Sequence, residues 1–263
     1  MENELIRPIV RIGNSAGVIL PRKWLNSQAK VVLEPLNIEK DILDILIKEE
    51  ILKEIEGVYL VGSYARSEQT IDSDIDVLAI TNNLNKIIKK GRYEITCVSK
   101  EKTDYLLKNN ALPILAWIKE AKTVINENLR ISLTNTPLNK KNLKWHIETT
   151  KSAMKVMEKS IELSKDMGLK EGDASSYSLV LRLRTFYIID CIRKNKQWKK
   201  KEFLSLIKKI SGSLNAYEGY LRVKNDSKEK GRYNLEIKEA EKLMNYINKK
   251  IKEIEKWAKE KKD

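Results

Sequence analysis

Apolar positions follow three different patterns along the chain, and the first pattern covers residues 1–36. Short apolar runs between residues 9 and 33 alternate with turns such as Gly13-Asn14-Ser15, which is typical of a small β-hairpin segment. The apolar residues 31–33 are expected to form a further strand. A segment of this length buries too little surface to fold alone, so we expect it to dimerise or to dock.

The second pattern, over residues 37–135, mixes helical and strand-like spacing. Helical spacing is found over residues 38–56 and again over residues 104–129. Three short apolar or alternating runs between them are expected to be strands, over residues 58–61, 75–80 and 92–98. This arrangement predicts an α/β domain with a short mixed sheet.

The third pattern, over residues 136–263, is helical almost throughout. Breaks at four places divide it into four or five amphipathic helices, which predicts a helical bundle. The whole chain is therefore expected to be an α+β protein with a hairpin segment (1–36), an α/β domain (37–135) and a helical bundle (136–263).

Composition excludes several classes of protein. With 41% hydrophobic and 33% charged residues the chain has a globular composition. Its longest uncharged stretches fall far short of the roughly 20 apolar residues of a membrane span, and its first residues lack signal-peptide character. Two distant cysteines, Cys97 and Cys191, and a single histidine, His146, exclude a zinc finger, a disulfide scaffold and a Ser-His-Asp triad. We expect a cytoplasmic protein.

The positive charge is concentrated in the helical half. The net charge of the chain is +14, and residues 136–263 hold 32 lysines and arginines against 18 acidic residues. Such a basic surface favours a polyanion such as nucleic acid. The alternative is a lysine-rich composition of the kind found in heat-adapted proteins. Both interpretations remain open, because the lysines are dispersed along helices.

The clearest chemistry joins an apolar run ending at Gly62-Ser63 to the pair Asp74 and Asp76. A strand–glycine–helix junction presents backbone N–H groups and a hydroxyl to a phosphate. Asp74 and Asp76 flank Ile75 at the start of an expected strand, so both carboxylates fall on one face. Paired carboxylates can hold two divalent cations, an arrangement that serves phosphoryl or nucleotidyl transfer. Either half alone is common by chance, but their combination is informative.

The two phrases, residues 62–67 and 73–77, closely resemble the signature of the DNA polymerase β-like nucleotidyltransferase superfamily, G-S-x-A-R-G followed by S-D-I-D-L. Ser67 replaces the usual glycine and removes no functional group. The resemblance implies that Gly62 and Ser63 bind the triphosphate, and that the two aspartates of the second phrase bind metal ions. It also implies a third carboxylate on a following strand, which Glu94 supplies as a metal ligand and as the base toward the attacking hydroxyl.

Alternatives stay open at two of these residues. Glu94 could be an exposed acid near a strand edge instead of a ligand. Arg66 could contact the nucleotide phosphates, as the resemblance suggests, or pair structurally with an acid on its own helix. Asp72, between the two phrases, is expected to serve the turn.

Two other parts of the chain resemble known families. Residues 11–25 resemble the AbrB-like swapped-hairpin family, with its pattern R-x-G-N-S-x-G-V-x-L-P-K, which implies an interleaved dimer and DNA as its partner. The helical half resembles the acceptor-binding domain of kanamycin-type nucleotidyltransferases and the HEPN partner of minimal nucleotidyltransferases. HEPN RNases carry Arg-x(4–6)-His, whereas the arginine that precedes His146 is Arg130, sixteen residues away. The RNase motif is absent, and His146 is expected to be a surface or packing residue.

The sequence thus predicts an Mg²⁺-dependent nucleotidyltransferase. It would use two ions, or Mn²⁺ in their place, to move an NMP, expected to be AMP, from an NTP such as ATP to an acceptor. The basic bundle favours a nucleic acid or an acidic protein patch as acceptor over a cationic small molecule. The alternative is an antitoxin-like or nucleic-acid-binding regulator with a subordinate or silent transferase site. A homodimer through residues 1–36 and no contact with a membrane are expected.

Overall fold

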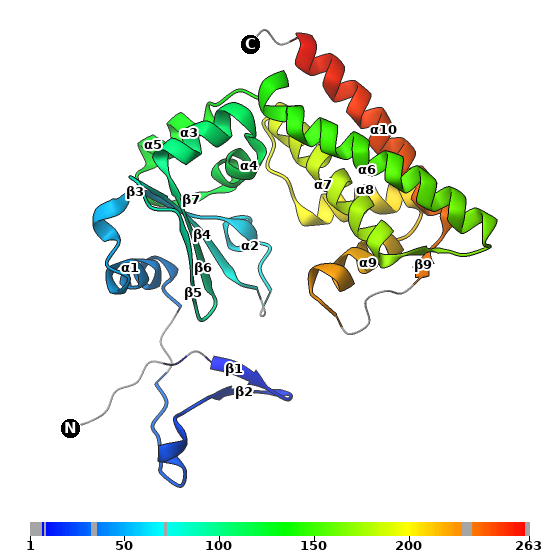
Figure 1. Cartoon of the computed structure of the whole chain (residues 1–263). Coiled ribbons are helices and arrows are strands. Elements are labelled where there is room, and N and C mark those ends of the chain that lie inside the picture. Colours follow the sequence, from blue (N-terminus) through cyan, green and yellow to red (C-terminus); the bar gives the residue numbers. More distant parts are fainter. Residues whose placement is uncertain (1–6, 8, 33–35, 71–72, 228–232, 261–263) are drawn as a thin grey trace.

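A small hairpin forms the first part of the structure. The computed structural model describes residues 7, 9–32, 36–70, 73–227 and 233–260 (Figure 1). Strands β1 (Ile9–Ile12) and β2 (Ser15–Val18) pair antiparallel, and Gly13 makes the turn between them with a φ of +58°. A short 3-10 helix, η1 (Arg22–Trp24), follows. The strand expected at residues 31–33 is wrong for Val31 and Val32, which have no regular structure, and its last residue lies outside the described part.

A five-stranded mixed sheet lies at the centre of the next part of the chain (Figure 1). Its order is β5-β6-β4-β3-β7, with β4 and β6 parallel and the other neighbours antiparallel. The strands span β3 (Ile55–Leu60), β4 (Ile75–Thr81), β5 (Lys86–Lys90), β6 (Tyr93–Ser99) and β7 (Lys122–Ile125). The sequence predicted β3, β4 and β6, whereas the two edge strands β5 and β7 were missed.

Helix α1 (Ile38–Lys48) packs against one face of this sheet. Its N-cap is Asn37, whose side chain accepts from the Lys40 amide. The helix expected over residues 38–56 is too long, because the chain turns at Glu50, which has a φ of +59°, and continues as a 3-10 turn, η2 (Leu52–Glu54). This face of the sheet and α1 share one buried apolar cluster, which includes Ile42, Leu46, Val58, Val77 and Ile95.

The opposite face of the sheet is covered by helices. The single helix expected over residues 104–129 is wrong: that region contains the end of α3 (Lys100–Asn109), all of α4 (Leu112–Glu120), β7 and the start of α5 (Glu127–Thr134). Pro113 lies in the first turn of α4, where proline is tolerated, and Asn126 caps α5. Together these helices bury the sheet residues Tyr59, Leu78, Ile80 and Val98.

Five further helices are described in the C-terminal half, as the sequence predicted. They are α6 (Lys140–Asp166), α7 (Asp173–Arg193), α8 (Lys200–Ser211), α9 (Asn215–Lys224) and α10 (Ile237–Glu260). A short antiparallel pair, β8 (Glu171–Gly172) with β9 (Tyr233–Leu235), was not predicted. The bundle and the helix-covered face of the sheet share one continuous core. None of the described helices combines the length and the apolar character that a membrane span requires.

Candidate active site

Asp76 and Glu94 lie opposite each other on the two parallel strands of the sheet. They are register partners in the β4–β6 pair, so their side chains start from one edge of the same face. Asp74 precedes β4 by one residue and is exposed, whereas its neighbour Ile75 is fully buried. The period-2 alternation predicted from the sequence is therefore present. It places the carboxylates on the sheet face opposite α1, the face of Leu78 and Ile80.

Gly62 begins α2 (Gly62–Ala65), a single helical turn that follows β3. Its φ of +70° lies in the left-handed region, and a Cβ atom built on it would lie 3.0 Å from Cγ of Asp76. The amide of Val61 donates to the carbonyl of Asp76 at 2.9 Å. Glycine is required here because the turn passes directly against the Asp76 side chain.

Arg92 holds the loop that leads to the two aspartates. Its Nη2 donates to the hydroxyl of Tyr64 at 2.7 Å and to the carbonyl of Ser73 at 2.9 Å. The amide of Ile75 in turn donates to the carbonyl of Arg92 at 2.7 Å. One arginine thus connects α2, the residue before Asp74 and the start of β6.

Negative charge is concentrated around Asp76. Burial raises the pKa of this carboxyl above its ordinary value, and the charges of Glu94 and Asp74 raise it further. The positive charges of Lys224 and Arg66 act in the opposite direction. Three oxygen-donor groups that repel one another are a donor set that suits a hard divalent cation.

The side chains are not grouped as a closed metal site. Glu94 forms an ion pair with Lys89 on the neighbouring strand at 2.6 Å. Throughout the described residues, no three His, Cys, Asp or Glu side chains are grouped in a way that could hold a metal ion. The chemistry of the donors fits a divalent cation, although Glu94 is paired with Lys89 in this structure.

Arg66 and the amide of Gly62 both bond to a carboxylate that the sequence reasoning missed. Glu120, at the end of α4, accepts from the Gly62 amide and from Arg66 Nη1, each at 2.8 Å. Arg66 Nε also donates to Glu68 at 2.9 Å. Arg66 therefore pairs with acids that lie outside α2, whereas the expected pair was with an acid on its own helix, and its contact with nucleotide phosphates stays a prediction. Gly62 and Ser63 are both predicted to bind phosphate. The Gly62 amide donates to Glu120 in this structure, whereas Ser63 offers its hydroxyl and an amide in the first helical turn, where amides lack helical partners.

The helical half contributes Lys224 near these carboxylates. Lys224 is the last residue of α9 and is close enough to Asp76 to lower the pKa of its carboxyl. No local motif marks Lys224, because it reaches the site only through tertiary packing. Arg184 on α7 stacks on Trp198.

His146 and both cysteines lie away from these carboxylates. His146 is buried in α6, and burial together with the charge of Arg182 lowers its pKa to about 4. It is a packing residue, one of the two roles expected of it. Cys97 and Cys191 are free and buried. Asp72 lies outside the described residues.

Comparison with known proteins gives a family match and several similar solved structures. The family model described as a nucleotidyltransferase domain matches residues 40–202. A nucleotidyltransferase-like protein from Exiguobacterium sibiricum is 12% identical, with 82% of this chain and 75% of that chain covered and a TM-score of 0.39. A spectinomycin adenyltransferase from Enterococcus faecialis, solved with ATP and spectinomycin, is 15% identical, with coverages of 81% and 98% and a TM-score of 0.42. No curated protein sequence matches.

Proposed function

The chain belongs to the nucleotidyltransferase domain family, and on this premise we propose that it transfers AMP from ATP to an acceptor with the help of divalent metal ions. The observation that carries the proposal is the pairing of Asp76 with Glu94 across parallel strands, with Gly62 packed directly against Asp76. A glycine turn beside paired carboxylates is the arrangement that the two signature phrases, residues 62–67 and 73–77, predict. Gly62, Asp76 and Glu94 come from three separate segments of the chain.

Each residue has a distinct role in the proposed reaction. Ser63 binds the triphosphate through its hydroxyl and amide, next to the Gly62 turn. Asp74, Asp76 and Glu94 would hold Mg²⁺, or Mn²⁺ in its place, and the bound metal supplies charge neutralisation at the phosphates. The acceptor oxygen attacks the α-phosphorus, the bond to pyrophosphate breaks, and Glu94 takes the proton of the attacking hydroxyl.

Metal-dependent ATP binding tests this site. Calorimetric titration of the protein with ATP should show binding that requires Mg²⁺, and Asp74→Asn and Asp76→Asn should each lose this Mg²⁺-dependent binding. Lys209→Ala, an exposed change on α8, serves as the control and should bind as the wild type does. ATP binding that is equal in all proteins and independent of metal would refute the proposal.

For the acceptor we propose an acidic molecule, either a nucleic-acid end or an acidic protein patch. Lys224 lies near Asp76, and the helical half carries an excess of positive charge, so a cationic acceptor would meet repulsion there. Labelled ATP with Mg²⁺ can be offered to tRNA, to lysate proteins and to small cations. Label only on a small cation would overturn the choice of acceptor.

A second candidate function is that of a nucleic-acid-binding regulator with a silent transferase site. The observation that favours it is the basic helical half combined with the AbrB-like hairpin. Retention on duplex DNA should then fall steeply as salt increases, because phosphate contacts release counterions. Absence of retention at low salt would remove this candidate.

We also propose a cytoplasmic homodimer joined through residues 1–36. Several large apolar side chains of this segment are exposed, among them Ile19 (67%), Leu25 (67%), Val31 (62%) and Val32 (71%). Burial of this surface against a second copy would be favourable. Light scattering should give a dimer for the full chain and a monomer for residues 37–263. A full-length monomer would refute the prediction.

A further inference from the structure

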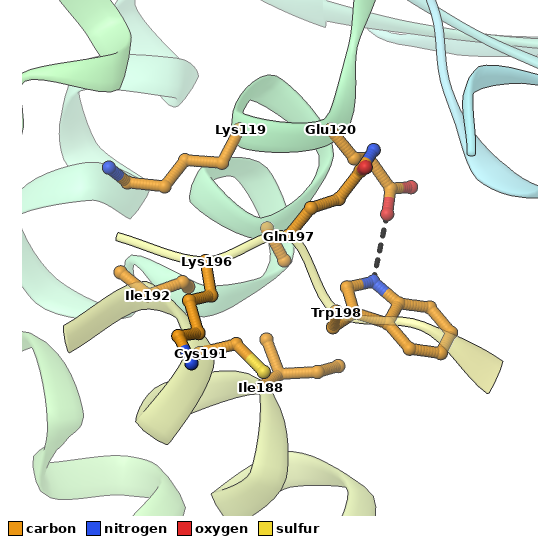
Figure 2. Close-up of a pocket in the computed structure, with 9 residues that line it drawn as sticks. Lys119, Glu120, Ile188, Cys191, Ile192, Lys196, Gln197 and Trp198 are labelled. Carbon is orange, nitrogen blue, oxygen red and sulfur yellow. Dashed lines mark hydrogen bonds between the residues drawn. The ribbon is translucent and has the colours of Figure 1, made fainter. Parts of the chain in front are cut away.

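Glu120 is a buried carboxylate that joins three separate parts of the chain. Only 6% of the residue is exposed. One carboxylate oxygen accepts from the Gly62 amide, and the other accepts from Arg66 Nη1 and Trp198 Nε1, with all three distances at 2.8 Å. Figure 2 shows the indole nitrogen of Trp198 directed at this carboxylate. A single side chain therefore connects the candidate phosphate-binding turn to the helical half.

Trp198 lies in the segment between α7 and α8 and is itself held by two arginines. Its ring lies 4.0 Å from the Arg66 guanidinium carbon and 4.9 Å from that of Arg184. These distances are typical of cation–π contacts. The ring is 9% exposed, so the contacts are largely shielded from water. Trp198 thus docks on Glu120 of α4 by a hydrogen bond and on Arg66, just after α2, by stacking.

A second carboxylate reinforces the same docking. Glu68, just after α2, accepts from Arg66 Nε at 2.9 Å and from the amide of Lys200 at 2.7 Å. Residues 198–200 are therefore fixed to α2 through two acids that share Arg66. Removal of one partner from such a buried charged network leaves the remaining donors or acceptors unsatisfied, which costs more than a surface ion pair is worth.

The Gly62 turn has little freedom to move independently of this network. Its amide is fixed by Glu120, and its α-carbon faces the Asp76 side chain so closely that a Cβ would lie 3.0 Å from Cγ. A shift of residues 198–200 would therefore pass through Glu120 to the turn and to the carboxylate beside it.

We infer that Glu120 is a positioning residue that couples the docking of residues 198–200 to the shape of the Gly62–Ser63 turn. The segment 198–200 of the helical half then helps to set the nucleotide site through its contact with Glu120. The effect on nucleotide binding rests on the proposed function. The coupling itself does not, and it can be measured separately.

The test uses full-length variants and two readouts. Glu120→Gln removes the charge, and Trp198→Phe keeps a ring on Arg66 while removing the indole N–H. Glu171→Gln is the matched control, because Glu171 is also buried, at 2% exposed, but bonds to Ser160 and Ser175 in the helical half. Hydrogen exchange is measured over residues 61–66 and 196–200, and the KM for ATP and kcat are measured alongside the melting temperature.

We expect Glu120→Gln to speed exchange in both segments and to raise the KM for ATP about tenfold, with a smaller change in kcat. Trp198→Phe should give the same pattern to a smaller extent. Glu171→Gln should lower the melting temperature while leaving both segments and the KM as in the wild type.

Faster exchange in residues 196–200 alone, with residues 61–66 and the KM unchanged in Glu120→Gln, would overturn the inference. If Glu120→Gln does not fold, the same comparison is made with Trp198→Phe and decides the outcome. If the wild type neither binds ATP nor transfers AMP, the proposed function fails, and the exchange data alone decide whether the two segments are coupled.

Discussion

Replacement of Gly62 by alanine would separate the backbone requirement of the turn from its contact with Asp76. Gly62 has a φ of +70°, and an added Cβ would lie 3.0 Å from Cγ and 3.1 Å from Cβ of Asp76. Gly91 is a matched control, because its φ is +58° and no atom lies within 4 Å of an added Cβ. The difference between the two alanine variants therefore reports the contact with Asp76.

The expected losses of stability follow from the left-handed backbone conformation and from the steric contact with Asp76. A left-handed conformation costs an L-residue about 1–2 kcal/mol, and loss of chain entropy in the unfolded state returns about 0.4–1 kcal/mol. We therefore expect Gly91→Ala to lower the free energy of unfolding by about 1 kcal/mol. Gly62→Ala adds a steric cost of about 1–3 kcal/mol. Because the carboxylate is the part that can rotate away, AMP transfer should fall by about a hundredfold in Gly62→Ala alone.

Urea denaturation measures the loss of unfolding free energy, and pyrophosphate release measures the loss of AMP transfer. A double-mutant cycle with Asp76 tests whether the steric cost comes from the contact between residues 62 and 76. On an Asp76→Ala background the contact with Cγ is removed and the 3.1 Å contact with Cβ remains, so the extra unfolding free energy that Gly62→Ala costs over Gly91→Ala should become smaller. Equal losses of stability and activity for Gly62→Ala and Gly91→Ala would refute the reasoning. An undiminished cost of Gly62→Ala on the Asp76→Ala background would also refute it.

Two further predictions concern pH. The pKa of His146 is lowered to about 4 in the folded state from 6.5, so the unfolded chain binds the proton first as pH falls, and stability is lost between about pH 6.5 and pH 4. The loss of unfolding free energy should reach about 3 kcal/mol. In His146→Gln this pH dependence should disappear when unfolding is measured between pH 4 and pH 6.5, and an unchanged dependence of stability on pH would contradict the prediction. Lys224 lowers the pKa of Asp76, so Lys224→Ala should raise that pKa and shift the acidic limb of the transfer rate to higher pH. Lys209→Ala, the control, should leave the profile in place, and an unshifted limb in Lys224→Ala would show that its charge does not act on the site.

The parts of the site that the sequence predicted are those encoded by neighbouring residues. Asp74 and Asp76 are two positions apart, and their alternation around a buried isoleucine fixes their common face before any tertiary contact is known. Glu120 could not be found in this way, because it reaches Gly62 across 58 residues and Trp198 across 78. At the end of an amphipathic helix it has the appearance of a solvated acid. Only the packing of α4 on α2 makes it a buried hydrogen-bond acceptor.

The errors in secondary structure have equally local causes. Apolar residues at helical spacing continued beyond α1 to Ile55, but Glu50 adopts a left-handed conformation and the chain turns into η2 and β3. Likewise, the apolar residues of β7 matched a helical period by chance. That strand is short and lies at the edge of the sheet, where pairing with β3 determines its conformation. Short edge strands are set by their neighbours more than by their own pattern.

The boundary expected at residue 135 remains a prediction, and the core extends across it. One buried cluster runs from Tyr59 and Leu78 of the sheet through Leu115 of α4 to Leu179 of α7 and Ile247 of α10. A chain cut at residue 135 would expose the apolar face of α4 to water and would also lose the indole that donates to Glu120. The family match, which ends at residue 202, includes α6, α7 and Trp198 and so extends past the same boundary. The helical half is therefore part of the structure that holds the Gly62 turn in place, and loss of its docking would weaken both the core and the candidate site.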